Sequence, residues 1–341
     1  MSSSSRTDPD PVPAGSPPAA PPATDPAAVV AALDGAAVVG RRRELELVVA
    51  ALAAGRHVLL EGPPGTGKST LLRAVAAASG TAFVFVEGNA ELTPARLAGQ
   101  FDPARVLDEG YGPDTFVDGP LTAALRAGAL LYVEELNRVP EETINLLVTV
   151  MSEGELHLPR VGVVHAADGF RLVAAMNPFD NVGTARVSSA IYDRICRIVM
   201  DYQDADDETA IVGARTAAPP GLLVGRAVAV TRATRDHPEI RVGSSVRGAI
   251  DLVEVALRLA ELRGRSPLDP GVGLDAALVA LSGRIRLHEG GDRRPEDVVT
   301  ELWEAVLAAE HSAPPLPGDD ADGHDDGGKA PAPDGATPAH P

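Results

Sequence analysis

The sequence predicts an α/β fold in which a parallel β-sheet carries helices on both faces and a helical region follows. Short apolar runs of strand length are separated by long stretches typical of helices and loops, which favours parallel strands joined by crossovers. A glycine-rich turn follows the first of these runs, and two adjacent carboxylates end another. From residue 206 onward the apolar residues recur at helical spacing, so a helical domain is expected there.

The prolines mark both ends of the chain. Of the 30 prolines in 341 residues, eight lie in residues 1–26 and seven in residues 312–341. Neither stretch shows apolar periodicity, so both are predicted to be disordered. The sequence therefore predicts a disordered tail over 1–27, an α/β domain over 28–204, a helical domain over 205–311 and an acidic disordered tail over 312–341.

Charge and composition exclude several classes of protein. The net charge is −18, and the part between the tails keeps −11 of it. Phosphate neutralisation dominates nucleic-acid affinity, so this acidity argues against a nucleic-acid partner and disfavours a DNA motor. The single cysteine, Cys196, precludes an internal disulfide and suits the cytosol. Without a signal-like apolar segment or an apolar run of about 18 residues, we expect a cytoplasmic protein that does not insert into a membrane.

The strongest motif is a phosphate-binding loop. The apolar run Val58–Leu60 is followed by a full match to G-x-x-x-x-G-K-[ST] and then by a helical pattern. Glycines let backbone N–H groups form an anion-binding nest, Lys68 lies between the β- and γ-phosphates, and the Ser69 hydroxyl ligates Mg²⁺. A turn without a ligand is the alternative, which the flanking strand and helix disfavour. ATP and Mg²⁺ are therefore expected, with contacts from Gly62, Pro63, Pro64, Gly65, Thr66, Gly67, Lys68, Ser69 and Thr70.

Two glutamates end the apolar run that starts at residue 129. Carboxylates resist burial unless they are paired or bind a cation. A phosphate-binding loop needs a neighbouring strand whose end completes the Mg²⁺ shell and orients water. We expect Glu134 to reach the metal, through water, and Glu135 to act as the general base on the attacking water. The alternative is a solvated acidic turn, which the loop some 70 residues earlier disfavours.

With these motifs, residues 38–310 resemble an AAA+ ATPase of the MoxR branch, in the dynein-related group. The segment VVGRRRELELVVAAL resembles the family's entry segment, which implies that Val39, Gly40 and Arg41 lie near adenine. The family usually has Asp where this chain has the longer Glu134. The resemblance implies a P-loop core with strand order 5-1-4-3-2 and a C-terminal all-helical lid.

Three more segments resemble family motifs. The resemblance of the segment FRLVAAMNPFDNVGT implies that Asn177 is the family's sensor residue. The alternative is that the Asn-Pro pair only forms a turn that ends the strand. The resemblance of the segment SSAIYDRICRIVMDY implies that Arg194 is an arginine finger, a role for which Arg197 competes. The alternative is an ion pair between Asp193 and Arg197 on a helix. In RVGSSVRGAIDL, the first-turn Arg247 is expected to reach the γ-phosphate, and a solvated arginine is the alternative.

Expected elements follow from these patterns. A hairpin is expected over 153–169, either to grip peptides or as surface with no substrate role. Ser244 or Ser245 is expected to cap the helix that carries Arg247, and Trp303 is expected to lie in the core. The histidines show no metal-ligand spacing, so no metal beyond Mg²⁺ is expected. Strands are predicted at 57–61, 83–87, 129–134, 171–176 and 197–201, and lid helices within 245–263, 273–285 and 295–309.

The resemblance implies an ATPase that assembles as a ring, a hexamer, and acts as a chaperone. It would hydrolyse ATP to remodel or mature a partner complex, including cofactor insertion, with a von Willebrand factor A domain protein as partner. Gas-vesicle ATPases and the activators of rubisco or nitric oxide reductase share these motifs. A low-turnover nucleotide-binding scaffold or switch is an alternative of another class, because Glu134 replaces the usual Asp.

Overall fold

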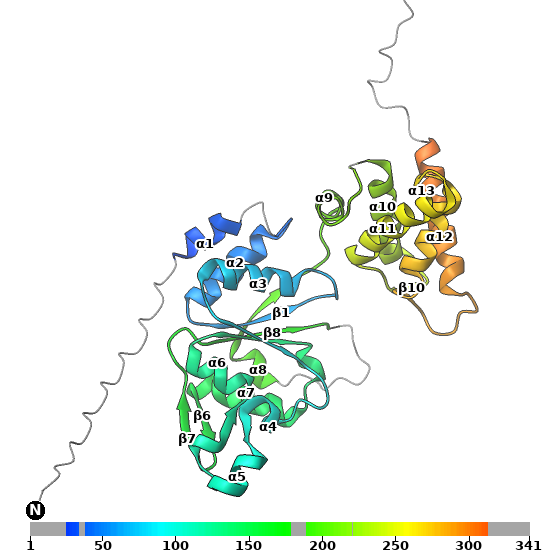
Figure 1. Cartoon of the computed structure of the whole chain (residues 1–341). Coiled ribbons are helices and arrows are strands. Elements are labelled where there is room, and N and C mark those ends of the chain that lie inside the picture. The colour runs from blue at the N-terminus through cyan, green and yellow to red at the C-terminus, as the bar shows by residue number, and fades with distance from the viewer. Residues whose placement is uncertain (1–24, 34–37, 179–188, 220, 313–341) are drawn as a thin grey trace, which may run out of the picture.

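The computed structural model describes residues 25–33, 38–178, 189–219 and 221–312. A sheet domain with helices on both faces is followed by a second, mainly helical part, to which helix α9 (Ala205–Arg215) leads (Figure 1). Among the described helices, none combines the length and the apolar composition that crossing a bilayer requires.

The central sheet confirms the predicted fold class. Its five strands are all parallel and lie in the order β2-β5-β8-β1-β9, which is the expected order 5-1-4-3-2 once they are counted along the chain. The sheet therefore brings the ends of β1, β5 and β8 to one edge. The strands are β1 (His57–Glu61), β2 (Phe83–Glu87), β5 (Leu130–Glu134), β8 (Arg171–Met176) and β9 (Ile195–Val199).

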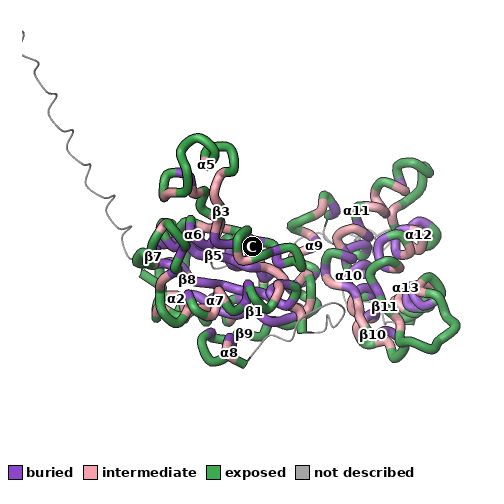
Figure 2. Tube along the Cα trace, turned by 90° about the horizontal axis from the view of Figure 1, so that it is seen from below, coloured by how far each residue is buried: buried purple, intermediate pink, exposed green. Residues whose placement is uncertain are grey.

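Alternate side chains of the sheet enter two separate cores. Leu59, Leu131 and Ala174 pack on one face, against α6 (Pro120–Ala127) and α7 (Glu141–Glu153). Leu60, Tyr132 and Val173 pack on the other, against α1 (Pro26–Leu33), α2 (Arg42–Ala53) and α3 (Lys68–Ser79). Burial on both faces explains the continuous apolar runs of these strands, and Figure 2 shows the sheet as the buried layer between exposed helices.

Smaller elements decorate the sheet domain. The hairpin predicted over 153–169 is present as β6 (Glu155–Leu158) paired with β7 (Gly162–His165). A second pair, formed by β3 (Gly99–Phe101) and β4 (Phe116–Asp118), was not expected from the sequence. The remaining pieces are α4 (Pro94–Ala98), α5 (Pro103–Glu109), η1 (Pro113–Thr115), η2 (Leu136–Arg138) and α8 (Ser189–Tyr192).

The second part has its own hydrophobic core, formed by α9 together with α10 (Leu222–Asp236), α11 (Val246–Arg263), α12 (Pro270–Leu281) and α13 (Pro295–Ser312). The prediction that this part is all-helical was wrong, because β10 (Ile240–Val242) pairs antiparallel with β11 (Arg286–Leu287). Strands of two or three residues are too short for an alternating pattern to reveal them.

Several predicted boundaries shift. The strand predicted at 197–201 occupies 195–199, because its pairing with β1 starts at Ile195 opposite His57. Helix α1 starts at Pro26, inside the stretch predicted to be a tail, and α13 continues to Ser312. The predicted tails otherwise lie outside the described residues.

Trp303 lies in the core of the helical part, as predicted, and its side chain is almost fully buried. Its ring fills the space beside Gly273, where an added Cβ would come within 2.2 Å of it. Replacing Trp303 by Ala is expected to lower the free energy of unfolding of this part by about 3–5 kcal/mol through cavity formation. Urea unfolding followed by circular dichroism measures this free energy. Replacing the half-buried Val306 by Ala is the control, which should lose less stability. A loss below about 1 kcal/mol for Trp303→Ala would contradict the placement of Trp303 in the core.

Candidate nucleotide-binding site

The loop between β1 and α3 is built to hold an anion. Gly65 and Gly67 have φ values of 77° and 86°, in the left-handed region that glycine adopts without strain. Gly62 lies so close to β9 that an added Cβ would be 2.0 Å from the carbonyl oxygen of Met200. The loop therefore turns tightly into the N-terminus of α3, where unpaired N–H groups and the helix dipole favour a phosphate.

Lys68 begins α3 and is 9% exposed. Its Nζ donates to the carbonyl oxygens of Gly62, at 2.9 Å, and Pro63, at 2.8 Å. Burial lowers the pKa of Lys68 to about 8, while the nearby Glu134 carboxylate partly offsets that effect. Nζ also donates to Oγ1 of Thr66 at 3.4 Å. A buried cation held by uncharged oxygens is suited to receive phosphate oxygens.

The lowered pKa of Lys68 predicts a pH-dependent affinity. Above about pH 8 the free protein loses the Lys68 charge, whereas bound phosphates favour the protonated form, so affinity falls as the pH rises. We expect ADP to bind about tenfold more weakly at pH 9 than at pH 7, as measured by calorimetric titration. The Lys68→Met variant should lack this dependence, and an affinity that stays constant to pH 9.5 would contradict the prediction.

The ends of α3 and β5 meet beside the loop. The Ser69 hydroxyl donates to Oε1 of Glu134 at 2.7 Å and lies 3.2 Å from the hydroxyl of Tyr132. Tyr132 is fully buried, and that burial raises its pKa, so its hydroxyl stays protonated. A hydroxyl and a carboxylate within one hydrogen bond of each other are hard oxygen donors, the ligand type that Mg²⁺ prefers. These residues fit a magnesium ion, and the extra methylene of Glu134 does not prevent the contact with Ser69.

Glu135 has an unusual backbone conformation. It follows β5 with φ 52° and ψ 45°, a left-handed conformation that is uncommon outside glycine and often marks functional sites. Its Oε2 lies 3.2 Å from Nε of Arg138, and both side chains remain partly exposed. Glu135 is therefore accessible to solvent beside the loop, where a base acting on water must lie.

One cavity of about 150 Å³ brings most of the predicted residues together. Asn177, which follows β8, and Arg247, from the first turn of α11, both line it. The amide of Asn137 donates to the backbone carbonyl of Asn177 at 3.4 Å. Gly62 and Pro63 are not in its lining, which comprises Pro64, Gly65, Thr66, Gly67, Lys68, Ser69, Thr70, Glu134, Glu135, Ala175, Met176, Asn177 and Arg247.

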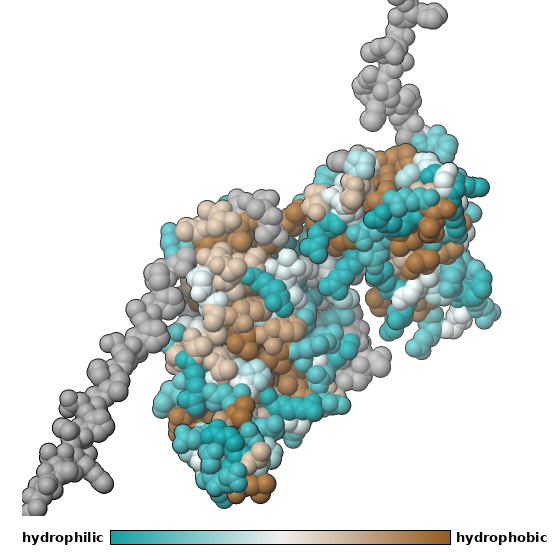
Figure 3. Space-filling model, viewed as in Figure 1, coloured by the Kyte–Doolittle hydropathy of each residue, from teal (hydrophilic) through white to brown (hydrophobic). Residues whose placement is uncertain are grey.

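A second cavity, of about 460 Å³, lies between the sheet domain and the helical part. In the space-filling view a cleft divides these two parts (Figure 3). Val39, Ile211 and Ile250 line this cavity and offer apolar surface that suits a flat base. Arg41, Arg215 and Arg247 line it too, so its walls are mixed. Gly40 is outside this lining; it is close to Asp207, whose carboxylate an added Cβ would meet at 1.9 Å.

Sequence reasoning missed how Arg41 is used. Its guanidinium is 4% exposed and donates to the carbonyl oxygens of Thr66, at 3.1 Å, and Asp201, and it pairs with Glu44. Burial lowers its pKa. Arg41 thus joins the phosphate-binding loop to the chain that leaves β9. No local pattern could reveal this, because Asp201 is 160 residues away in the sequence.

Arg194 lies outside both cavities, exposed on the surface. It donates to the hydroxyl of Ser152 and to the carbonyl of Ala190. Arg197 lies on β9 and pairs with Glu61 of β1, so the helical Asp193–Arg197 pair was the wrong alternative: α8 ends at Tyr192. Ser245 is the residue preceding α11, as expected, although its side chain makes no capping hydrogen bond there.

The hairpin gathers more metal-ligand types than the sequence suggested. Ligand atoms of Glu153, Glu155 and His157 lie within 4.8 Å of one another. Glu155 also accepts hydrogen bonds or ion pairs from both His157, at 2.9 Å, and His165, at 3.2 Å. The β6–β7 register adds His165 to this group by placing it opposite Glu155. Glu153 and His157 are exposed and Glu155 is half-buried, and the Glu155 carboxylate is already paired with the two histidines.

Comparison with known proteins agrees with this geometry. Residues 57–195 match the model of the AAA domain, dynein-related subfamily. The chain therefore carries an AAA domain.

Gas vesicle ATPase GvpN2 of Halobacterium salinarum is 34% identical over 60% of this chain, which spans 63% of that protein. The uncharacterized protein YeaC of Bacillus subtilis is 28% identical over 79% of this chain and 90% of its own length. Among solved structures, NtrX from Brucella abortus matches with a TM-score of 0.48 at 19% identity, covering 69% of this chain and 52% of that one. The AAA domain contains both β1 and β5, the two strands that end at the phosphate-binding loop and at Glu134.

Proposed function

We propose that this protein is a MoxR-type AAA+ ATPase that hydrolyses ATP with Mg²⁺ and uses the energy to remodel or mature a partner protein complex. The observation that carries the proposal is one cavity lined by Lys68, Glu134, Glu135, Asn177 and Arg247. A cation, a metal-type carboxylate, a base and two further polar groups are the set that phosphoryl transfer to water requires.

Each residue has a distinct proposed role. Lys68 and Arg247 hold the phosphates, Ser69 and Glu134 would hold Mg²⁺, and Asn177 orients the water. When bound, Mg²⁺ would neutralise the charge that develops on the β- and γ-phosphate oxygens. Glu135 accepts the proton of the attacking water, for which its partly exposed carboxylate is suited. The larger cavity accepts the base against the apolar side chains of Val39 and Ile250.

Assembly would complete the site. Arg194 is exposed and outside the cavity of its own chain, which supports a finger that reaches a neighbouring subunit. An arginine supplied in trans needs a head-to-tail interface, which either closes into a ring or grows into a filament. We propose a hexameric ring, a cytoplasmic location and a protein client, with a von Willebrand factor A domain protein as the partner. The acidity of the chain argues against nucleic acid.

A second candidate function is that of a gas-vesicle ATPase. The observation that favours it is the 34% identity with GvpN2 of Halobacterium salinarum. Both candidates share the hydrolytic site and differ in the client. Pull-down from the source organism with the Glu135→Gln variant, which should retain ATP, would separate them: recovery of gas-vesicle proteins supports the second, and a von Willebrand factor A domain protein supports the first.

Phosphate release with Mg²⁺, compared with release in excess chelator, tests the hydrolytic proposal. We expect turnover of about 0.1–10 per second, slow but typical of enzymes whose chemistry is coupled to movement. Mg²⁺-dependent ATP binding without turnover, even at concentrations that allow assembly, would favour the nucleotide-binding scaffold instead. If the protein shows no Mg²⁺-dependent affinity for ATP, the proposal is wrong.

A further inference from the structure

The turn that precedes α11 is hydrogen-bonded to the end of α10. The buried Ser244 uses both of its backbone groups: its N–H donates to Oγ1 of Thr234 at 2.8 Å, and its carbonyl accepts from Nε of Arg235 at 2.8 Å. Gly243 approaches so closely that an added Cβ would be 2.8 Å from Cα of Arg235. The start of α11 therefore has one position relative to Arg235.

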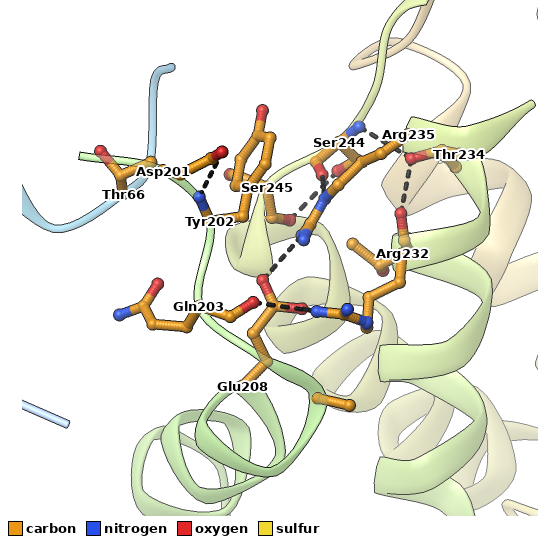
Figure 4. Close-up of polar contacts among 12 residues, drawn as sticks. Thr66, Asp201, Tyr202, Gln203, Glu208, Arg232, Thr234, Arg235, Ser244 and Ser245 are labelled. Atoms are coloured by element: carbon orange, nitrogen blue, oxygen red, sulfur yellow. Dashed lines mark hydrogen bonds and ion pairs between the residues drawn. The ribbon is translucent and has the colours of Figure 1, made fainter. Parts of the chain in front are cut away.

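Arg235 is itself held from two other elements. Its Nη2 donates to Oε1 of Glu208 at 2.8 Å, and its guanidinium carbon lies 3.9 Å from the centre of the Tyr202 ring. Glu208 is 1% exposed and also accepts from Arg232 at 3.4 Å. Figure 4 shows the guanidinium of Arg235 between the Tyr202 ring, the Glu208 carboxylate and the Ser244 carbonyl. The planar fork of arginine can meet three partners at once, which a lysine ammonium cannot do in this arrangement.

The linker between β9 and α9, residues 200–204, leads from this network back to the phosphate-binding loop. Tyr202 directly follows Asp201, whose carbonyl accepts from the buried Arg41. Arg41 also donates to the carbonyl of Thr66 in the loop, at 3.1 Å. A continuous set of contacts thus runs from the loop through Arg41 and Tyr202 to Arg235.

The helical side of the network ends at the same cavity. Ser245 precedes α11, and Arg247 is the second residue of that helix. Arg247 lines the cavity that contains Lys68. The Ser245 hydroxyl lies 2.3 Å from where a Cβ on Gly65 would be, so this turn also touches the loop. The direction from which Arg247 approaches the phosphates therefore depends on the turn that Arg235 holds.

We propose that Arg235 is a positioning residue for Arg247. Held by Glu208 and Tyr202, it fixes the Ser244 carbonyl and so sets the start of α11 relative to the linker and the phosphate-binding loop. This inference rests on the proposed function, in which Arg247 contacts the γ-phosphate. It assigns Arg235 a role in distinguishing ATP from ADP, although the side chain contacts neither.

The test compares the affinity for a non-hydrolysable ATP analogue with that for ADP, both with Mg²⁺, by calorimetry. Arg235→Lys keeps a cation opposite Glu208 and loses the bond to Ser244. We expect it to reduce the preference for the triphosphate about tenfold, the size of one lost charge-assisted hydrogen bond, as Arg247→Ala should. Arg232→Met is the matched control, because Arg232 lies on the same helix and shares Glu208 but does not contact Ser244; its preference should stay within about twofold of the wild type.

A second variant guards against misfolding. Glu208→Gln combined with Arg235→Met removes both members of the buried pair, which avoids leaving a buried unpaired charge. Arg232 also loses its carboxylate partner, but it is partly exposed and keeps its bond to the Gln203 carbonyl. It should also lose the preference for the triphosphate while it keeps a cooperative thermal transition. The inference is overturned if Arg247→Ala loses the preference and both Arg235 variants keep it, or if Arg247→Ala keeps it. A wild-type protein that binds neither nucleotide would instead overturn the proposed function.

Discussion

Replacing Glu135 by Gln is expected to slow ATP hydrolysis about 100-fold or more, because an amide cannot accept the proton of the attacking water. Gln has nearly the same shape, so the backbone conformation at φ 52° and the affinity for Mg²⁺-ATP should change little, by less than about threefold. Phosphate release at saturating ATP gives the rate, and calorimetric titration gives the affinity.

Glu87→Gln is the matched control for this experiment. Glu87 ends β2, directly opposite Glu134 in the sheet register, is exposed, and is not part of the cavity lining. Its substitution should leave the hydrolysis rate within about twofold of the wild type. If the wild type and Glu135→Gln are equally slow, Glu135 is not the base and the scaffold alternative gains support.

The sequence predicted those parts of the site that consist of short, contiguous residue patterns. The loop over 62–69 and the acids at 134 and 135 are each contiguous, and each follows an apolar run. Parallel strands place their carboxyl ends on one edge of a sheet, so two such patterns suffice to predict that they meet. Asn177 and Arg247 needed the family resemblance to be singled out, because neither residue type nor spacing distinguishes them.

The parts that could not be predicted depend on contacts between distant segments. Arg41 reads as one of three consecutive arginines, and only the fold shows that it is buried against Thr66 and Asp201. Glu208 reads as a residue of a solvated acidic helix start, yet it is almost fully buried between two arginines of α10. The Arg41 contacts form within the sheet domain and the Glu208 pairs form within the helical part. Each joins segments that are far apart in the sequence, so no local window contains its physical cause.

Replacing Lys68 by Met should weaken nucleotide binding about 100-fold or more. The variant keeps the length and apolar stem of the side chain and removes the cation that the phosphates would meet. Loss of one partner from a desolvated charge pair costs about 2–5 kcal/mol, which corresponds to a factor of about 30 to several thousand in affinity. Equilibrium titration with a fluorescent ADP analogue measures this loss directly.

Arg73→Met controls for the loss of a positive charge on the same helix. The Arg73 guanidinium lies over the rings of Phe83 and Phe85, 5.2 Å from each, and is not among the residues that line either cavity. Long-range attraction alone would weaken binding similarly in both variants, and increasingly so at low ionic strength. A loss confined to Lys68→Met and insensitive to salt instead requires direct contact with phosphate inside the loop, where Nζ already lies 2.9 Å from the Gly62 carbonyl.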